Sequence, residues 1–131
     1  MTYLVAHEKE IYDRLAELGQ KTRGELEAAF AAEGIYAHCT GHDSSVLPGS
    51  SMFMLHFPYQ EDARLDTPED WFDPAVCDMA LSHTVLDLAL LLEDVFMLHS
   101  HGGASIAHTE ADIEFLGEAC RRAARRIKPY L

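Results

Sequence analysis

Apolar residues recur at helical spacing through the start of the chain. Between about His7 and Glu33 they step by three or four positions, which predicts one long amphipathic helix. The residues that define its apolar side are Ile11, Leu15, Leu18, Thr22, Leu26 and Phe30. Gly34 follows directly, at a position where glycine commonly ends a helix. The opposite side is charged, so we expect it to face solvent.

After Gly34, apolar residues recur at every second position instead of every third or fourth. Ile35–Thr40 alternates apolar and polar residues, which predicts a half-buried strand. Gly41–Gly49 is rich in turn-forming residues and is expected to be a loop. Ser51–Phe57 is apolar enough to be a central strand, and Pro58 should end it because proline lacks the N–H that a sheet needs.

The middle of the chain combines a polar connection with a strongly apolar helix. Tyr59–Asp73 is polar and acidic, and Trp71 and Phe72 are expected to anchor its end to the core. The pair Asp73–Pro74 is a typical helix start, with aspartate as the N-cap and proline in the first turn. The predicted helix, Pro74–Glu93, is apolar almost all round in its second half. It should therefore be buried on more than one side, or face something outside the domain.

The C-terminal part predicts two short strands and a final helix. Val95–Leu98 and Ala104–Ala107 are the expected strands, and His99–Gly103 is the turn between them. Thr109 is a good N-cap for the helix, and Asp112 follows three residues later, as in a capping box. The apolar face of this helix comprises Ile113, Leu116, Cys120, Ala123 and Ile127. Its acidic residues come early and its arginines late, an order that suits the helix dipole without any ligand.

This order of elements predicts a single α+β domain over residues 1–131. The order is helix, strand, strand, helix, strand, strand, helix, with short strands at hairpin spacing. We therefore expect a two-layer sandwich, in which helices cover one face of a small, mainly antiparallel sheet. With 131 residues and 48% hydrophobic content, the chain is long enough for a core and too apolar for disorder.

Charge and cysteine content narrow the function classes. The net charge of −12 argues against sequence-independent binding to nucleic acid or to an anionic membrane. The apolar run Val85–Leu92 is too short to span a bilayer and contains Asp87, and the N-terminus lacks the pattern of a secretory signal. Cys39, Cys77 and Cys120 are far apart and odd in number, which indicates reduced thiols. We expect a cytoplasmic protein.

The histidines form the cluster with the most candidate chemistry. The possible metal ligands are His38, Cys39, His42, Asp43, His99 and His101. Their spacing matches no closed zinc pattern, and His38 and Cys39 should point to opposite sides of their strand. Histidines on loops and strand surfaces are therefore the favoured interpretation, with a metal site as the minor alternative. Nucleophilic catalysis is disfavoured because no serine lies in a Gly-x-Ser-x-Gly elbow.

Three stretches, in this order and spacing, resemble one protein family. They are IYDRLAELGQKTRGELEAAFAAEGI, GSSMFMLHF, and LLLEDVFML followed by SIAHTEADIEFLGEA. Together they resemble the C-terminal small domain of class III pyridoxal-phosphate aminotransferases, and within that class they are most similar to glutamate-1-semialdehyde 2,1-aminomutase and its relatives. The resemblance covers nearly the whole chain, and Ser105–Ile113 is its most specific part.

The resemblance implies a domain that lacks the chemistry of its parent family. In such enzymes the Schiff-base lysine and the phosphate-binding backbone lie in a large domain upstream, so this chain would not hold pyridoxal phosphate. Lys9, Lys21 and Lys128 lie in predicted helices, without neighbours that would lower a lysine pKa. The resemblance thus implies no catalytic, cofactor-binding or metal-binding residue here. It implies the large domain as partner, and we expect a homo-oligomer.

The predicted turn after Leu98 departs from the family pattern. His99, Ser100 and His101 stand where the aminomutases carry an acidic residue, and the connection is shorter, so the substrate is left open. By family analogy these residues would face the substrate cleft of an intact enzyme, whereas alone they would form an exposed turn. Two alternatives remain beside an inactive aminotransferase domain. One is a free-standing binding or assembly module, and the other is a histidine-based metal-binding protein.

Overall fold

The computed structural model describes residues 2–42 and 50–131, so most of the predicted loop Gly41–Gly49 lies outside the described residues. The helices are α1 (Thr2–Ala6), α2 (Glu8–Ala31), α3 (Pro68–Trp71), the π-helix η1 (Leu81–Val85), α4 (Leu86–Leu91), α5 (Glu110–Ile127) and the short 3-10 helix η2 (Lys128–Tyr130). The strands are β1 (His38–Cys39), β2 (Met52–His56) and β3 (His101–Gly103).

The three strands form one antiparallel sheet in the order β1-β2-β3. Along one edge of β2, Leu55 lies opposite Cys39 of β1, and along its other edge Met52 lies opposite Gly103 of β3. The predicted strand Ser51–Phe57 is therefore central, as its apolar sequence indicated. The predicted strand Ile35–Thr40 is confirmed over a shorter range, because only His38–Cys39 has strand geometry.

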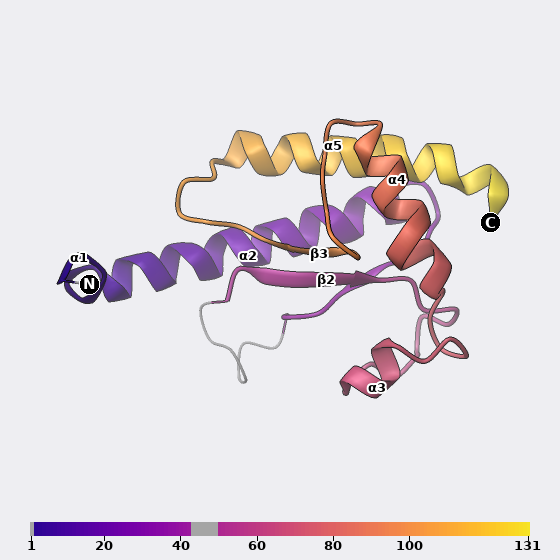
Figure 1. Ribbon diagram of the computed structural model, residues 1–131, viewed down its shortest axis with the longest axis horizontal. Coiled ribbons are helices and arrows are strands. Elements are labelled where there is room, and N and C mark those ends of the chain that lie inside the picture. Colours follow the sequence, from indigo (N-terminus) through magenta and orange to yellow (C-terminus); the bar gives the residue numbers. More distant parts are fainter. Residues whose placement is uncertain (1, 43–49) are drawn as a thin grey trace.

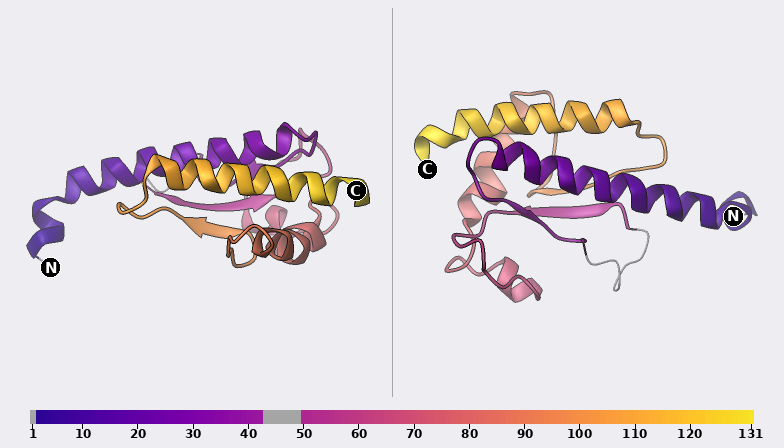
Figure 2. Two further views of the ribbon diagram at one scale, coloured as in Figure 1. Left: turned by 90° about the horizontal axis from the view of Figure 1, so that it is seen from above. Right: turned by 180° about the vertical axis from the view of Figure 1, so that it is seen from behind.

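The two long helices lie side by side over one face of this sheet (Figures 1 and 2). Phe30 of α2 packs edge-on against Phe57 at a ring separation of 5.0 Å, and Cys120 of α5 is fully buried in the same core. The α+β class, with helices on one face of a small antiparallel sheet, is confirmed. The short helix α3 is an addition: it places Trp71 beside His56, whose side chain belongs to the opposite face of β2.

The N-terminus of α5 follows the predicted capping box. The Thr109 side chain accepts a hydrogen bond from the Asp112 N–H, and the Asp112 carboxylate accepts one from the Thr109 N–H at 2.7 Å. The bonds that the Asp112 carboxylate accepts from the Thr109 N–H and hydroxyl lower the pKa of Asp112, because they favour its charged form. Ile113, Cys120 and Ile127 are buried as expected, so this helix is fixed by its cap and by its apolar face.

Ion pairs between helices account for much of the charge on α5. Glu110 at its start accepts from Lys21 of α2 at 2.7 Å, and Arg125 near its end donates to Glu33 at 2.8 Å. Glu93 accepts from both Arg122 and Arg126. These bonds lower the pKa of Glu93, as an arginine neighbour should. Arg122, Arg125 and Arg126 thus have acidic partners within the protein, which the explanation by the helix dipole did not foresee.

The second helical region begins later than predicted. Asp73 and Pro74 start a turn instead of the helix, and the Asp73 side chain accepts a hydrogen bond from the Ala75 N–H at 2.8 Å. After the turn, the backbone of Cys77 pairs with that of Pro58 in an isolated antiparallel β-bridge. Helical backbone starts at Met79, where the Asp78 carboxylate accepts from the Leu81 N–H at 2.9 Å. The predicted range Pro74–Glu93 was wrong at its start because the aspartate–proline signal served a turn.

The hairpin predicted around residues 99–103 was wrong in its boundaries. Val95–Leu98 and Ala104–Ala107 are not strands, and the strand is His101–Gly103, within the stretch that the sequence assigned to the turn. The turn itself is shorter, because His101 donates its N–H to the Leu98 carbonyl at 3.0 Å. Beyond this bridge the two arms separate: the chain comes from the side of α5 to Leu98, and β3 then runs along β2 (Figure 1).

The remaining anchors are partly as expected. Trp71 donates from its indole N–H to the Leu65 carbonyl at 2.8 Å, so it fixes the connection, whereas Phe72 is exposed. All three cysteines are free and buried. Among the residues that the structure describes, no helix is long and apolar enough to cross a membrane.

Candidate functional site

The turn between Leu98 and His101 contains the most strained backbone of the candidate residues. His99 and Ser100 both lie in the left-handed region, with φ of 51° and 62°. Such conformations cost non-glycine residues roughly 1–3 kcal/mol each, and they persist only where the surrounding structure enforces them. Backbone strain of this kind is concentrated at functional sites, so this turn is the candidate site.

Asp87 of α4 holds the turn from one side. Its carboxylate accepts from the His99 N–H at 3.0 Å and from the Ser100 N–H at 3.4 Å. In this left-handed turn the two successive N–H groups converge on the one carboxylate. These charge-assisted hydrogen bonds stabilise the left-handed conformation of His99 and Ser100.

Ser100 holds the turn from the other side. It is fully buried, and its hydroxyl donates to the Ser82 carbonyl, which belongs to η1. A π-helical turn of this kind is rare and is often found at functional sites. The π-helix of Leu81–Val85 and the strained turn are thus parts of one arrangement.

Imidazole rings surround this arrangement. The His83 ring lies 5.5 Å from the His99 ring and 5.9 Å from the Phe72 ring. His56 on β2 is almost fully buried, and burial, together with repulsion from His38, His101 and His83, lowers its pKa to about 4. The pKa of His83 is lowered for the same reasons, burial being the larger. The Nε2 atoms of His56 and His83 are buried without a hydrogen-bond partner among the described residues.

His101 is held in one tautomer. Its Nδ1 lies 2.8 Å from the His99 carbonyl, and because a carbonyl can only accept, the proton must be on Nδ1. In the neutral ring, Nε2 is then a hydrogen-bond acceptor. The His101 side chain is exposed at the start of β3, so this acceptor is available to a ligand.

The three predicted cleft-facing residues do not form a uniformly exposed turn. His99 and His101 are exposed, whereas Ser100 is buried and structural. The expectation of an exposed turn was therefore wrong for Ser100. The chemistry that the site offers is hydrogen bonding by two imidazoles on a rigid backbone, with Asp87 and Ser82 in support.

The other histidine cluster is organised by Glu27 of α2. Its carboxylate accepts from the Cys39 N–H at 2.7 Å and contacts His42 Nε2 at 2.9 Å, and His38 Nδ1 lies 3.4 Å away. Cys39 is buried whereas His38 is half-buried, and the alternation of the strand places their side chains on opposite faces. Burial raises the pKa of the Cys39 thiol, so it is not a reactive thiolate. Asp43 lies outside the described residues, and within them no group of three or more His, Cys, Asp or Glu side chains could hold a metal ion.

None of the lysines has the surroundings of a Schiff-base lysine. Lys9 contacts Asp13 and Lys21 contacts Glu110, and both contacts raise the lysine pKa. A Schiff-base lysine needs the opposite shift, because only the neutral amine is a nucleophile. Lys128 is exposed in η2. The residues of this chain therefore do not fit the covalent attachment of pyridoxal phosphate.

Sequence reasoning missed the residues that support the turn. Asp87, Ser82 and His83 come from the helix before it and were not assigned a role. One signal was present: Asp87 is the only charged residue in the apolar run Val85–Leu92, and an isolated acid in such a run needs hydrogen-bond donors. The sequence alone could not show which donors would meet Asp87, because the tertiary fold brings them to it.

Comparison with known proteins shows the fold to be shared with part of a transaminase. The chain is similar to an omega-transaminase from Sphaerobacter thermophilus, with a TM-score of 0.65 and 23% sequence identity. The match covers 89% of this chain but only 24% of the transaminase chain. No protein-family model matches the sequence, and no curated protein matches it either. At this identity, the likeness establishes the fold.

Proposed function

We propose that this chain is the C-terminal small domain of a class III pyridoxal-phosphate aminotransferase of the glutamate-1-semialdehyde 2,1-aminomutase type. The observation that supports the proposal is the structural match, which covers 89% of this chain and 24% of an omega-transaminase chain. The family-like stretches support it, because LLLEDVFML and SIAHTEADIEFLGEA flank the strained turn on either side in the sequence. A domain shared at 24% of a larger chain is a part whose activity depends on the rest.

In this proposal the chain is inactive alone. Pyridoxal phosphate supplies the electron sink for amino-group chemistry when it is bound, and the residues that bind it would belong to a large domain. Lys9 and Lys21 are ion-paired and Lys128 is exposed, so in this proposal none would serve as the covalent attachment point. The chain's own contribution would be to shape one wall of the substrate cleft.

His99 and His101 are the residues we assign to that wall. Both are exposed, and both are fixed by a turn that the Asp87 carboxylate and the Ser82 carbonyl hold rigid. The acceptor at His101 Nε2 would orient a donor group of the substrate. Asp87 acts through these residues and is therefore a positioning residue.

The C-terminal apolar surface is the face that we assign to the large domain or to a second copy. It comprises Val85, Leu88, Leu92, Tyr130 and Leu131, which line a hollow of about 470 Å³ between η1–α4 and η2. Their side chains are 40–87% exposed. Exposed apolar residues gathered around one hollow are typical of an interface. We accordingly propose a cytoplasmic protein that self-associates when it is isolated.

One experiment separates this proposal from a pyridoxal enzyme and from a metalloprotein. Purified chain is mixed with pyridoxal phosphate, its visible spectrum is recorded, and the sample is reduced with borohydride and analysed by mass spectrometry. We expect no stoichiometric adduct at Lys9, Lys21 or Lys128, and no metal in the purified sample. An adduct at any of them, at one per chain, contradicts the proposal.

A second experiment tests the parent enzyme. The reading frame immediately upstream of Met1 is determined, and a joined product carrying a lysine-bearing large domain is assayed for aminotransferase and aminomutase activity. His101→Leu should then raise KM more than it lowers kcat, because it removes an acceptor that orients substrate. A genuine start at Met1 without any such domain, together with a monomer by sedimentation, would favour the free-standing module instead.

A further inference from the structure

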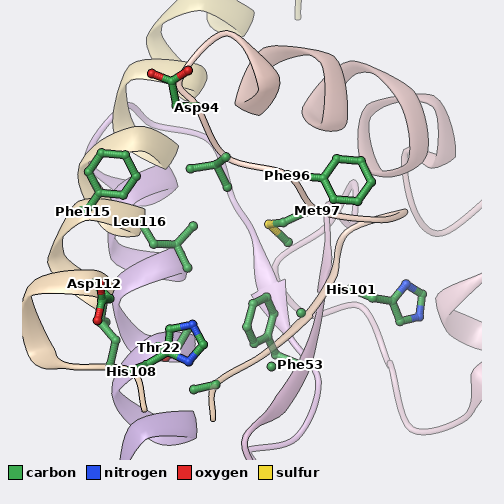
Figure 3. Close-up of a pocket in the computed structure, with 15 residues that line it drawn as sticks. Thr22, Phe53, Asp94, Phe96, Met97, His101, His108, Asp112, Phe115 and Leu116 are labelled. Atoms are coloured by element: carbon green, nitrogen blue, oxygen red, sulfur yellow. The ribbon is translucent and has the colours of Figure 1, made fainter. Parts of the chain in front are cut away.

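A cavity of about 340 Å³ lies between the first half of α5, the stretch 94–97 and β3, and the proposed function gives it no role. Figure 3 shows Phe115 and Leu116 of α5 on one side, Phe96 and Met97 on the other, and Phe53 of β2 between them. Pockets that bind small molecules in proteins begin at about 300 Å³. The cavity is therefore large enough for one small molecule.

The walls of this cavity are apolar and are part of the packed interior. Phe53, Met97 and Ile113 are buried, so their neighbours fix their positions. Phe96 is 75% exposed and Phe115 is 51% exposed, so two aromatic rings stand at the mouth. A fixed apolar floor with aromatic rings at the entrance is typical of a site for an apolar ligand.

β3 contributes a wall without side chains. Gly102 is explained by packing within the sheet, since a Cβ there would lie 2.3 Å from Cζ of Phe53. Gly103 also lines the cavity and has no such reason, because a Cβ there would make only ordinary contacts at 3.6 Å or more. A glycine within a strand often marks a place where a ligand approaches the backbone closely. The bare backbone of β3 leaves room for a flat ring.

His108 gives the cavity a hydrogen-bond donor of known direction. The Ser105 N–H donates to Nδ1 of His108 at 2.9 Å, and because an N–H can only donate, Nδ1 carries no proton. The proton of the neutral ring is therefore on Nε2. Figure 3 shows the His108 ring pointing into the cavity beside Phe53, whereas the ring of His101, the other histidine of the lining, is turned away from it.

The charged residues of the lining favour a neutral ligand. Asp94 and Asp112 line the cavity, and no lysine or arginine is among its described lining residues, so an anion is repelled. A cation offers no acceptor to the N–H of His108. The acids also lie apart from that N–H: Figure 3 shows Asp94 at the opposite end of the cavity, and the Asp112 carboxylate already accepts from the N–H and the hydroxyl of Thr109.

We propose that this cavity binds a small, neutral aromatic molecule that carries an oxygen acceptor. The ring of the ligand lies among Phe53, Met97 and Leu116, and its hydroxyl or carbonyl oxygen accepts a hydrogen bond from Nε2–H of His108. Burial of the ring supplies the affinity, and the single N–H fixes the orientation. The proposal does not depend on the aminotransferase assignment, because it uses none of the turn residues to which that assignment gives a role.

The test uses the full chain, labelled with ¹⁵N, and benzyl alcohol as the probe. Toluene is the matched control without oxygen, benzoate is the matched anion and benzylamine is the matched cation. We expect saturable shifts of the amide signals of His108, Met97 and Leu116 with benzyl alcohol. Toluene should bind about fivefold more weakly because it leaves the N–H of His108 without an acceptor, and both charged ligands about tenfold more weakly.

Three variants separate the hydrogen bond from the apolar contact. His108→Asn still offers an oxygen to the Ser105 N–H but has no group at the position of Nε2, so the preference for benzyl alcohol over toluene should disappear. Leu116→Trp fills the cavity and should weaken the binding of both ligands about tenfold. Leu88→Ala lies on the C-terminal apolar surface instead, and it is the control that should leave the affinity for both ligands unchanged.

Several results would overturn the proposal. They include no saturable binding of benzyl alcohol, equal affinity for toluene, and an unchanged preference in His108→Asn. Tighter binding of benzylamine than of benzyl alcohol would show that the acids select a cation. Binding that Leu88→Ala weakens and Leu116→Trp does not would place the ligand elsewhere. Self-association that shifts the same amides and excludes the probe would show that a second copy of the chain is the occupant.

Discussion

Mild acid should destabilise this protein through His56. The side chain is 1% exposed, and burial with nearby imidazoles lowers its pKa from the ordinary 6.5 to about 4. A histidine whose pKa is lowered by folding stabilises the fold while it is neutral. The stability is complete above the unfolded pKa, and it is lost as the pH falls from about 6.5 toward 4, because the unfolded chain binds the proton more readily.

The size of the effect follows from the difference between the two pKa values. Its upper limit is about 3 kcal/mol, and roughly 2 kcal/mol should already be lost at pH 5. The lowered pKa values of His38 and His83 act in the same direction. Glu93, Glu110 and Asp112 have lowered pKa values as well, but carboxylates lose their contribution only at more acid pH. The interval between pH 6.5 and 5 therefore isolates the histidines.

Urea unfolding followed by tryptophan fluorescence measures this directly. Trp71 is the one tryptophan of the chain, and its ring lies 5.7 Å from the His56 ring, so the signal comes from the site itself. His56→Phe removes the titrating group and should reduce the loss between pH 6.5 and 5 by roughly 2 kcal/mol. His7→Gln, outside this cluster, is the matched control and should behave as wild type. An unchanged pH dependence in His56→Phe would refute the reasoning.

Three further substitutions test the supports of the fold and the turn. Thr109→Ala should cost about 1 kcal/mol of unfolding free energy in urea, because the N-cap bond is lost. Ile113→Ala, at a site 3% exposed, should cost about 2–5 kcal/mol in the same assay, and a silent result would contradict its burial. Asp87→Asn leaves one oxygen for two N–H donors, so it should cost about 1–2 kcal/mol and speed amide exchange at His99 and Ser100. Exchange as slow as in wild type would show that Asp87 does not hold the turn.

The sequence specified the long elements because their signals are repeated many times. In α2 and α5 successive apolar positions all indicate the same helical period. At the start of α5, Thr109 and Asp112 form a capping box, a signal that depends only on residues close in sequence. The central strand Met52–His56 was predictable for a related reason: a short run that is almost wholly apolar must be covered on both faces.

The hairpin was mispredicted because its backbone contradicts local preferences. Glycines at 102 and 103 indicated a turn, yet they form the strand, since only a bare Gly102 can lie against the Phe53 ring. The left-handed residues are instead His99 and Ser100, and that region is uncommon for any residue other than glycine. Their conformation is imposed by Asp87 and Ser82, so it could not be derived from residues 99–103 alone.

The all-round apolarity of the second helical region has two separate causes. Leu86 and Leu90 face the core, and Leu88 and Leu92 line the uncovered C-terminal apolar surface. Asp87 faces neither side and reaches the turn. One short helix therefore connects the surface that we assign to a partner with the backbone that positions His99 and His101. Under the proposed function, a large domain that covers Leu88 and Leu92 would also fix the helix that carries Asp87, so docking and the geometry of the turn are mechanically linked.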